Sequence, residues 1–373
     1  MYLTLYKQNK PHTTTPDYDN IMQTISTETE TTYYKTTVYI ENPTIRTALT
    51  QQHRQKIEQA EKYIIEAWEI LKPFVNNCEE QYYEFQIPKR SGGLRTINAP
   101  KTEFKEALSK VKDIFEQKIK CLAHNSAYAY TKQRSVMDAL KIHQANESNW
   151  YLKIDLTDFF PSCTPNLIFT QLKQLYPFYY FDTPADIILK AIINACCLRG
   201  GLPQGTPMSP LLTNLIMVPY DYKISNALKR GIGEHWVYTR YADDILVSSK
   251  SDFDWRKMEN ILAENLRPFQ IKHEKTRYGS RAGSNWNLGL MLNKDNNITL
   301  GSNKKKLLNA MLNNFIKDYK NNIHWSREDT YQLQGHLSYL KQIEPNYYNY
   351  IVQKYEAKYN IQDYRELIKN ILR

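Results

Sequence analysis

Short apolar runs of the kind that form β-strands mark the middle of this chain. They cover residues 151–154, 236–238 and 245–247, and are rich in the aromatic and β-branched residues that strands favour. Only a few residues separate the second run from the third, so this pair predicts a β-hairpin with a tight turn. The first run ends at Asp155 and is soon followed by Thr164-Pro165, an N-cap and first-turn pair that predicts the start of a helix.

Helical spacing of apolar residues dominates the regions on either side of these strands. A long helical pattern begins at Asn42-Pro43 and continues through Leu71. In the last third, the same spacing predicts three amphipathic helices, the first capped by Ser302, the second by a capping box at Ser326 and the third beginning at Pro345. Three such helices predict a small C-terminal bundle.

The composition indicates a nucleic-acid partner. The chain has 49 Lys and Arg against 39 Asp and Glu, a net charge of +10, and a basic surplus is expected when the partner is a phosphate polymer. It also has 29 tyrosines, and those near basic residues in the last third suit stacking on bases. An AT-rich genome would account for part of this tyrosine content. Residues 1 to about 40 are polar and aperiodic, which predicts an extension that is disordered or ordered only by a partner.

The cysteines and the hydropathy argue against several other classes of protein. None of the five cysteines forms a Cys-x-x-Cys pair, so neither a zinc site nor a disulfide framework is indicated. The sequence has neither a signal peptide nor an apolar stretch long enough to cross a membrane. We therefore expect a cytoplasmic protein with no membrane partner, since free thiols suit a reducing compartment.

Three acidic residues stand where the predicted strands end. Asp243 and Asp244 occupy the turn of the hairpin, and Asp155 ends the earlier strand. Considered separately, Asp243 and Asp244 could be a solvated pair of acids in a turn, and Asp155 could be a residue that only caps the end of a strand. Taken together, like charges held close repel one another, and Mg²⁺ would relieve that repulsion because it prefers oxygen ligands. Two such ions can clamp the attacking and leaving oxygens of a phosphoryl transfer.

Six segments in a fixed order give the chain a resemblance to a known family. The segments are residues 87–100, 151–161, 201–211, 241–244, 275–276 and 287–290. In this order and spacing they resemble reverse transcriptases, above all the bacterial retron, group II intron and defence-associated branches, from about Ile87 to the C-terminus. The resemblance implies an α+β, right-hand polymerase fold with fingers, a palm made of an antiparallel sheet plus helices, and a C-terminal helical thumb.

The expected domain boundaries follow from this resemblance and from the patterns above. An N-terminal extension covers residues 1–40, and an N-terminal helix and fingers cover 41–150. The palm covers 151–300, with an interleaved fingers segment at about 164–200, and the helical thumb covers 301–373. The chain after the last motif is long enough for a thumb but too short for an added nuclease domain.

The resemblance also implies roles for individual residues. Asp155, Asp243 and Asp244 are implied to be catalytic and to bind two Mg²⁺ ions, for which Mn²⁺ can substitute, and Phe160 is implied to be the steric gate that excludes a 2′-hydroxyl. The other residues implied in nucleotide binding are Lys89, Arg95, Asp158, Phe159, Gln204, Gly205 and Lys275. Contacts to nucleic acid are expected from Tyr241, Lys132, Arg134, Lys304, Lys305 and Lys306, and solvated surface side chains are the alternative for these basic residues.

The implied activity is RNA-directed DNA synthesis from dNTPs, with a dedicated non-coding RNA as template and cDNA as product, in bacterial antiphage defence. An effector protein or a second copy of the chain is a further candidate partner. Retron enzymes carry a Val-Thr-Gly element where this chain has Asn287-Leu288-Gly289, and an Asn-Ala-x-x-His element where Leu198 stands in place of the histidine. These departures favour an enzyme of the abortive-infection type. The alternative is a retron reverse transcriptase that copies its structured RNA with that RNA as primer.

Two other functions remain open at this point. An RNA-binding scaffold, as in a maturase-like ribonucleoprotein, has no physical need for three converging carboxylates. An RNA-dependent RNA polymerase is disfavoured by the bulky Phe160. Primer extension separates the reverse transcriptase from these two alternatives. It compares dNTPs with rNTPs and the wild type with Asp243→Ala.

Overall fold

A computed structural model of the chain describes residues 43–373 except for 89–91, 232–235, 282–285 and 287–288. The extension expected at residues 1–40 and the implied nucleotide contact Lys89 therefore lie outside the described residues. The described part combines helices with three small antiparallel sheets, which confirms the expected α+β organisation with an antiparallel central sheet and a helical C-terminal region.

The central sheet has the strand order β4-β5-β3-β6, with all neighbours antiparallel. Its strands are β3 (Trp150–Asp155), β4 (Val237–Tyr241), β5 (Asp244–Ser249) and β6 (Arg277–Ser280). The strands β4 and β5 form the predicted hairpin. Its turn leaves only Ala242 and Asp243 between the two strands.

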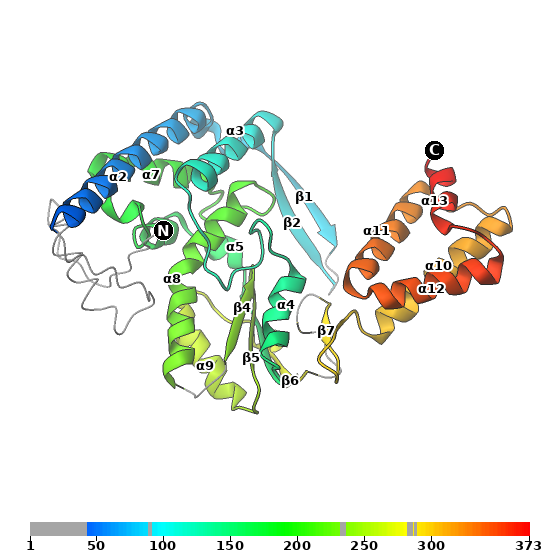
Figure 1. Cartoon of the computed structure of the whole chain (residues 1–373). Coiled ribbons are helices and arrows are strands. Elements are labelled where there is room, and N and C mark those ends of the chain that lie inside the picture. Colours follow the sequence, from blue (N-terminus) through cyan, green and yellow to red (C-terminus); the bar gives the residue numbers. More distant parts are fainter. Residues whose placement is uncertain (1–42, 89–91, 232–235, 282–285, 287–288) are drawn as a thin grey trace.

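Most helices of the first two thirds lie between the strands in sequence and around them in space (Figure 1). Before β3 come α2 (Pro43–Leu71), η1 (Lys72–Asn77), η2 (Glu79–Gln81), α3 (Thr102–Asp113), η3 (Ile114–Lys118) and α4 (Val136–Ala145). Between β3 and β4 come α5 (Phe159–Ser162), α6 (Pro165–Leu172), η4 (Phe178–Tyr180), α7 (Thr183–Cys196) and α8 (Met208–Gly231). Helices α9 (Trp255–Leu266) and η5 (His273–Lys275) precede β6.

Strand alternation gives the central sheet two different faces. Leu152, Ile154, Ile245 and Val247 belong to the larger core, which also contains residues of α8 and α9. Tyr151 and Leu246 point to the opposite face and join a second core with Leu140 of α4. Along β3 and β5, Asp155 and Asp244 alternate with the residues of the larger core, so both acids lie on the second face. Asp155 is the last residue of β3 and Asp244 is the first residue of β5.

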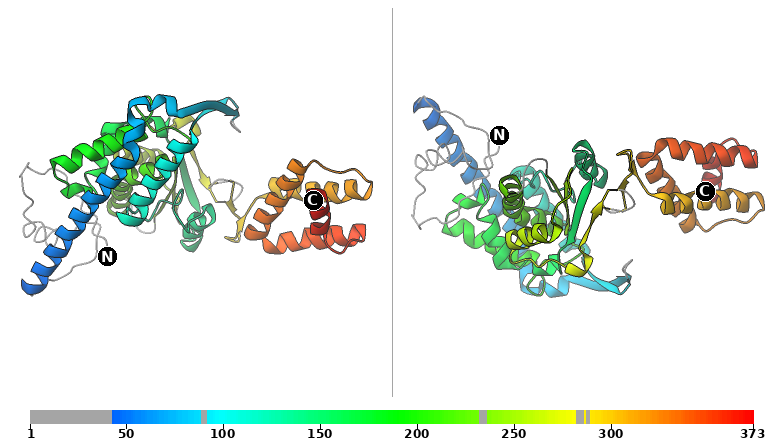
Figure 2. Two further views of the ribbon diagram at one scale, coloured as in Figure 1. Left: turned by 90° about the horizontal axis from the view of Figure 1, so that it is seen from above. Right: turned by 90° about the horizontal axis from the view of Figure 1, so that it is seen from below.

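A two-stranded hairpin extends away from the rest of the molecule near the central sheet (Figures 1 and 2). It consists of β1 (Tyr82–Pro88) and β2 (Leu94–Pro100), which fall at the first of the six segments that carry the resemblance. Residues of β1 are mostly exposed. A backbone hydrogen bond of 2.8 Å from the amide of Asn98 to the carbonyl of Gln204 ties β2 to the loop that precedes α8.

The C-terminal helices form a bundle set to one side, joined to the remainder through the short strands β7 (Met291–Leu292) and β8 (Ile298–Thr299) (Figure 2). The bundle has four helices, α10 (Ser302–Lys320), α11 (Arg327–Ile343), α12 (Pro345–Tyr359) and α13 (Tyr364–Leu372). Sequence periodicity predicted the first three and missed α13. The Ser326 cap is confirmed, whereas Ser302 is already inside α10 and the cap position is Gly301.

Among the described residues, no helix has the length and apolar character needed to span a membrane.

Candidate active site

The hairpin turn presents its acids through an unusual backbone conformation. Ala242 has φ +58°, in the left-handed region that non-glycine residues seldom adopt and that clusters at functional sites. Arg240 holds this conformation, since its guanidinium NH1 donates to the carbonyl oxygen of Ala242 at 3.2 Å. The turn therefore points Asp243 and Asp244 away from the buried strands that carry them.

The sheet register brings the distant Asp155 to this turn. Asp155 is paired directly with Asp244 across β3 and β5, and partners in an antiparallel pair have Cα atoms roughly 4.5–5.5 Å apart. The three acids, which are far apart in the sequence, therefore share one edge of the sheet. This is the arrangement that the sequence predicted for Asp155 and the hairpin.

Two lysines neutralise part of this negative charge. Lys275 donates to Oδ2 of Asp155 at 2.6 Å, and Lys153 lies 3.0 Å from Oδ2 of Asp244. Lys153 is two positions before Asp155 on β3, so strand alternation places its side chain on the same face as the acids. The role of Lys153 was missed from the sequence, although this spacing was the available signal.

Burial and the repulsion of neighbouring carboxylates shift Asp243 and Asp244 toward the protonated form. Burial, and then the charges of Asp155 and Asp244, raise the pKa of Asp243 to about 6. Burial also raises the pKa of Asp244, while Lys153 opposes this change. The hydrogen bond to Asp155 raises the pKa of Lys275. A site with this excess of carboxylate charge favours a bound cation.

The donor set fits a hard divalent cation, because it consists of carboxylate oxygens. Within the described ranges, no group of three or more His, Cys, Asp or Glu side chains is already arranged as a metal site. In this structure Lys275 and Lys153 hold one oxygen each of Asp155 and Asp244. A cation at these acids would compete with the two ammonium groups for those oxygens.

Two hollows meet at the acids. The larger, of about 850 Å³, extends from the acids to the β1–β2 hairpin and to the loop before α8. The smaller, of about 670 Å³, lies on the side of the turn and is lined by Tyr241, Lys153 and Arg277 among others. Five residues line both hollows: Arg95, Tyr130, Asp155, Asp243 and Lys275.

The larger hollow collects most of the residues implied in nucleotide binding. Its lining includes Arg95, Asp158, Phe159, Phe160, Gln204 and Lys275. Phe159 is only 2% exposed and packs against Phe269, with ring centroids 5.3 Å apart. Phe160 is half-buried and meets Phe159 edge to face, which leaves Phe160 as the ring more accessible from the hollow. Asp158 is exposed and has φ +41°.

Gly205 lies where the chain passes very close to β2. A Cβ atom at this position would lie 2.9 Å from Cγ2 of Ile97, and φ is +119°, so both space and backbone conformation require glycine. This loop then enters α8, where Oγ1 of Thr206 accepts from the amide of Ser209 at 3.2 Å. The glycine thereby fixes Gln204 at the wall of the larger hollow.

The basic residues expected to contact nucleic acid differ in their surroundings. Arg134 donates to the carbonyl oxygens of His124, Asn125 and Ala127, so its guanidinium is engaged within the fold. Lys132 is exposed and pairs with Glu116 at 3.1 Å.

The three consecutive thumb lysines also divide into different roles. Lys305 pairs with Glu344 at 3.0 Å, and Lys304 lies over the ring of Tyr339 at 5.4 Å. Lys306 is exposed.

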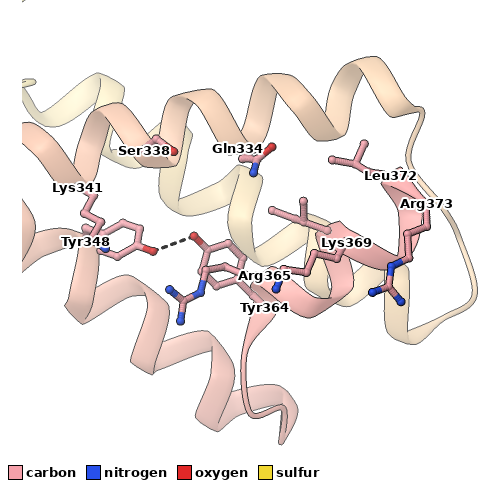
Figure 3. Close-up of a pocket in the computed structure, with 10 residues that line it drawn as sticks. Gln334, Ser338, Lys341, Tyr348, Tyr364, Arg365, Lys369, Leu372 and Arg373 are labelled. Carbon is pink, nitrogen blue, oxygen red and sulfur yellow. Dashed lines mark hydrogen bonds between the residues drawn. The ribbon is translucent and has the colours of Figure 1, made fainter.

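A separate cavity of about 420 Å³ lies among α11, α12 and α13 (Figure 3). Its lining residues include four basic side chains, Lys341, Arg365, Lys369 and Arg373. The hydroxyls of Tyr348 and Tyr364 meet at 2.9 Å on its wall. This cavity depends on α13, the helix that sequence periodicity did not predict.

Comparison with known proteins agrees with this geometry. Residues 87–292 match the family described as reverse transcriptase (RNA-dependent DNA polymerase). The retron Ec73 reverse transcriptase of Escherichia coli is 30% identical over 73% of this chain and 86% of its own length. The retron Ec83 enzyme of Escherichia coli is 28% identical over 74% and 86%. The retron Mx65 enzyme of Myxococcus xanthus is 27% identical over 71% and 62%.

Among solved structures, apo telomerase from Candida tropicalis aligns with a TM-score of 0.43 at 14% identity, over 78% of this chain and 60% of that one, which is too weak to add to the assignment. The departures at Leu198 and residues 287–289 favoured an abortive-infection enzyme, but the relatives are retron enzymes and support the retron alternative. The chain belongs to the reverse transcriptase family and is an RNA-directed DNA polymerase of the bacterial retron type.

Proposed function

We propose that the protein performs DNA synthesis at the edge of the central sheet, with Asp155, Asp243 and Asp244 as the catalytic carboxylates. The observation that carries this proposal is the register of β3 and β5, which pairs Asp155 with Asp244 beside the hairpin turn. The wall shared by the two hollows contains Asp155 and Asp243. Reactants entering from either side would meet at these acids.

The same three residues would hold the divalent metal on which reverse transcriptases generally depend, and we propose Mg²⁺, with Mn²⁺ as a substitute. When bound, such ions supply charge stabilisation for the attacking and leaving oxygens of the transfer. Oxygen donors and the raised pKa of Asp243 support this assignment. Lys153 and Lys275 would give up their hydrogen bonds to the acids as the cation binds.

The larger hollow is the proposed binding site for the incoming dNTP. Arg95 would neutralise the triphosphate, because a guanidinium binds phosphate oxygens in a bidentate manner. Phe160 would pack under the sugar and exclude a 2′-hydroxyl, and Gln204 would contact the sugar or base. Lys275 also lines this hollow, and once released from Asp155 its ammonium group would neutralise or protonate the leaving pyrophosphate.

The template is proposed to be a dedicated non-coding RNA that also provides the primer. This proposal rests on the retron relatives, whose names describe retron reverse transcriptases. The four basic side chains around the C-terminal cavity offer phosphate contacts to such an RNA (Figure 3). We further propose that the cDNA acts in antiphage defence in the cytoplasm, with an effector protein or a second copy of the chain.

Primer extension on an RNA template tests the polymerase assignment. The wild type is expected to extend a primer with dNTPs and not with rNTPs, and Asp243→Asn is expected to abolish extension. Asp295→Asn provides a matched control, because Asp295 is an exposed acid in the turn between β7 and β8. Extension with rNTPs alone would identify an RNA polymerase instead.

A second experiment separates the polymerase from an RNA-binding scaffold. Phage protection is compared between cells that express the wild type and cells that express Asp243→Asn. Equal protection would favour the scaffold, and loss of protection with retained RNA binding would favour cDNA synthesis. Sequencing the nucleic acid that co-purifies with each protein would identify the template and the starting point of the copy.

A further inference from the structure

The face of the central sheet that carries the acids also carries a pair of cations, two residues further along the strands. Lys153 of β3 is paired directly with Arg277 of β6, so the two side chains stand next to each other on one face. Lys153 lies two residues before Asp155 on β3, a separation of roughly 6.6 Å. This face therefore presents a row of acids at the end of the sheet, followed by a row of cations.

An aromatic layer covers the same face beyond the cations. Tyr151, two residues before Lys153, stacks on Trp286 with ring centroids 5.2 Å apart, and Trp286 is only 1% exposed. Arg277 is exposed, and its guanidinium carbon lies 5.6 Å from the centre of the Trp286 ring. The two cations therefore lie between the acids and the covered part of the face, where they line the smaller hollow.

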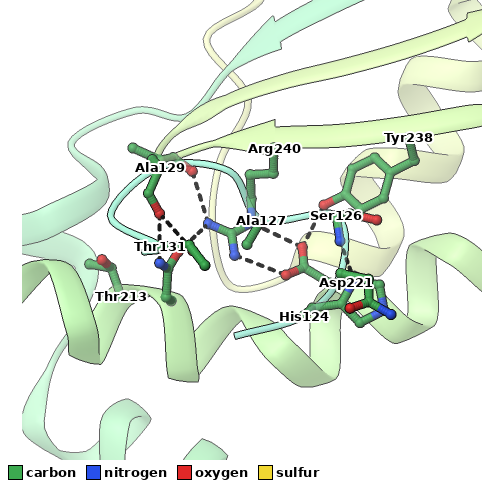
Figure 4. A network of polar contacts seen from close by, with 12 residues as sticks. His124, Ser126, Ala127, Ala129, Thr131, Thr213, Asp221, Tyr238 and Arg240 are labelled. Atoms are coloured by element: carbon green, nitrogen blue, oxygen red, sulfur yellow. Dashed lines mark hydrogen bonds and ion pairs between the residues drawn. The ribbon is translucent and has the colours of Figure 1, made fainter. Parts of the chain in front are cut away.

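The catalytic turn has an anchor other than these cations. Arg240 of β4 forms a buried ion pair with Asp221 of α8 at 2.9 Å (Figure 4). Its NH1 also donates to the carbonyl oxygen of Ala242 at 3.2 Å, which holds the turn. Because the backbone of the turn is held in this way, the ion pair between Lys153 and Asp244 can exchange partners without releasing the turn.

Two cations placed directly opposite each other repel, and such a pair destabilises a sheet. In this structure Asp244 compensates Lys153, since its Oδ2 lies 3.0 Å from Nζ. If a divalent metal takes the oxygens of Asp244, as proposed above, Lys153 loses that partner and its repulsion with Arg277 is no longer relieved. An anion between the two side chains would remove this repulsion, and lysine and arginine both bind phosphate oxygens.

The position of the cations relative to the reaction identifies the anion. In an in-line transfer the attacking oxygen and the leaving pyrophosphate lie on opposite sides of the phosphorus. Among the described residues, Lys153 and Arg277 line the smaller hollow and not the larger one, which contains the proposed dNTP residues. They therefore lie on the side from which the 3′-hydroxyl of the primer approaches. Pairing and stacking cover the bases of the primer end, but its phosphodiesters stay open to protein contacts.

We propose that Lys153 and Arg277 bind the phosphodiester that joins the last two nucleotides of the primer. Their separation from the acids along the strands is one that a single sugar with its phosphate can cover. Holding the primer at this point aligns its 3′-hydroxyl with the incoming phosphate. Lys153 would bind the phosphate once released from Asp244, so metal binding and primer binding would support each other. This inference rests on the proposed polymerase function and adds the site that holds the primer end.

Single-turnover primer extension with the full chain tests the proposal, at saturating Mg²⁺ and dNTP and at subsaturating primer. The last linkage of a DNA primer is either a normal phosphodiester or a neutral methylphosphonate. The neutral linkage should slow the wild type by roughly 10- to 100-fold, the usual effect of losing hydrogen bonds between charged groups. The double variant Lys153→Gln with Arg277→Gln should be slow on the normal primer, and the neutral linkage should slow it further by about twofold at most.

Two further variants separate phosphate binding from an effect on the acids. Arg277→Gln leaves the ion pair of Lys153 with Asp244 in place, and it should respond less than the wild type to the neutral linkage. Lys250→Gln is the matched control, because Lys250 follows β5 at the end opposite to the acids and pairs with Glu147 at 3.2 Å. The neutral linkage should slow this control as much as it slows the wild type.

The results have distinct meanings. A double variant that the neutral linkage slows as strongly as the wild type would overturn the inference. A wild type that extends both primers at equal rates would do the same while leaving the polymerase function intact. If the double variant extends neither primer, Arg277→Gln decides, and its full response to the neutral linkage would count against the site. A wild type that extends neither primer would instead remove the proposed function and this inference with it.

Discussion

Replacement of Asp221 by asparagine tests how far the buried network beneath the catalytic turn stabilises the protein. Asp221 and Arg240 both have side chains with 0% exposure, and Arg240 donates from Nε and NH2 to the two carboxylate oxygens at 2.9 Å each. Tyr238 adds a hydrogen bond of 2.6 Å from its hydroxyl to Oδ1. Asp221→Asn keeps the shape and removes the charge, so the guanidinium remains buried without its counter-ion.

The expected cost is large, because removing one partner of a buried ion pair costs about 3–5 kcal/mol. At about 2–4 °C per kcal/mol for domains of 150–250 residues, the melting temperature should fall by roughly 6–20 °C. Thermal melting followed by circular dichroism measures this shift. Glu147→Gln is the control, since the Lys250–Glu147 pair has side chains 45% and 71% exposed and exposed pairs contribute little.

Two outcomes would refute this reasoning. An Asp221→Asn protein that melts with the wild type would show that the buried pair does not stabilise the fold. A double variant with Asp221→Leu and Arg240→Met should be more stable than Asp221→Asn, because it buries no unpaired charge. If the double variant were the less stable protein, the interpretation of the network as a charge pair would fail.

Three further predictions concern separate parts of the molecule. His143 is fully buried between Ser248 and Thr239, and burial lowers its pKa to about 3. As the pH falls below about 6.5, the unfolded chain takes up a proton on His143 and the folded protein does not, so unfolding is favoured. In urea unfolding, the free energy of unfolding of the wild type should therefore fall by about 2 kcal/mol more than that of His143→Gln between pH 7.5 and pH 5. An equal loss in both proteins would contradict this. Phe160→Ala should allow rNTP incorporation in primer extension, and continued exclusion of rNTPs would place the gate elsewhere. Gly205→Ala should reduce extension and lower the melting temperature, because the added Cβ would lie 2.9 Å from Ile97; unchanged activity and stability would show that the loop can move away.

Strands β3, β4 and β5 and the hairpin turn could be predicted, because each depends on local alternation and on turn chemistry. The convergence of Asp155 with Asp244 depends on the pairing of β3 with β5, and the resemblance to reverse transcriptases implied it where local patterns could not. The lysine contacts depend on more than local patterns. Lys153 follows from alternation along β3, but Lys275 reaches Asp155 across 120 positions. No sequence periodicity encodes a contact of that kind.

The parts that were missed depend on long-range packing or on weak local signals. Arg134 resembled an exposed cation, yet it holds three carbonyl groups of the loop that precedes it. Arg277 is one of 49 lysines and arginines, and only the pairing of β6 with β3 places it beside Lys153. Helix α13 has nine residues, close to the shortest length at which helical spacing can be recognised.

Binding of Mn²⁺ to the full chain, followed by electron paramagnetic resonance, tests the central claim most directly. The protein is loaded with an RNA template, a primer that lacks the 3′-hydroxyl and a dNTP, so that the complex forms without reaction. If Asp155, Asp243 and Asp244 share a pair of ions, the wild type should bind two Mn²⁺ ions, and Asp243→Asn should bind fewer or bind them more weakly, while Asp295→Asn should match the wild type. Equal Mn²⁺ binding by the wild type and Asp243→Asn would contradict a shared metal site at these carboxylates.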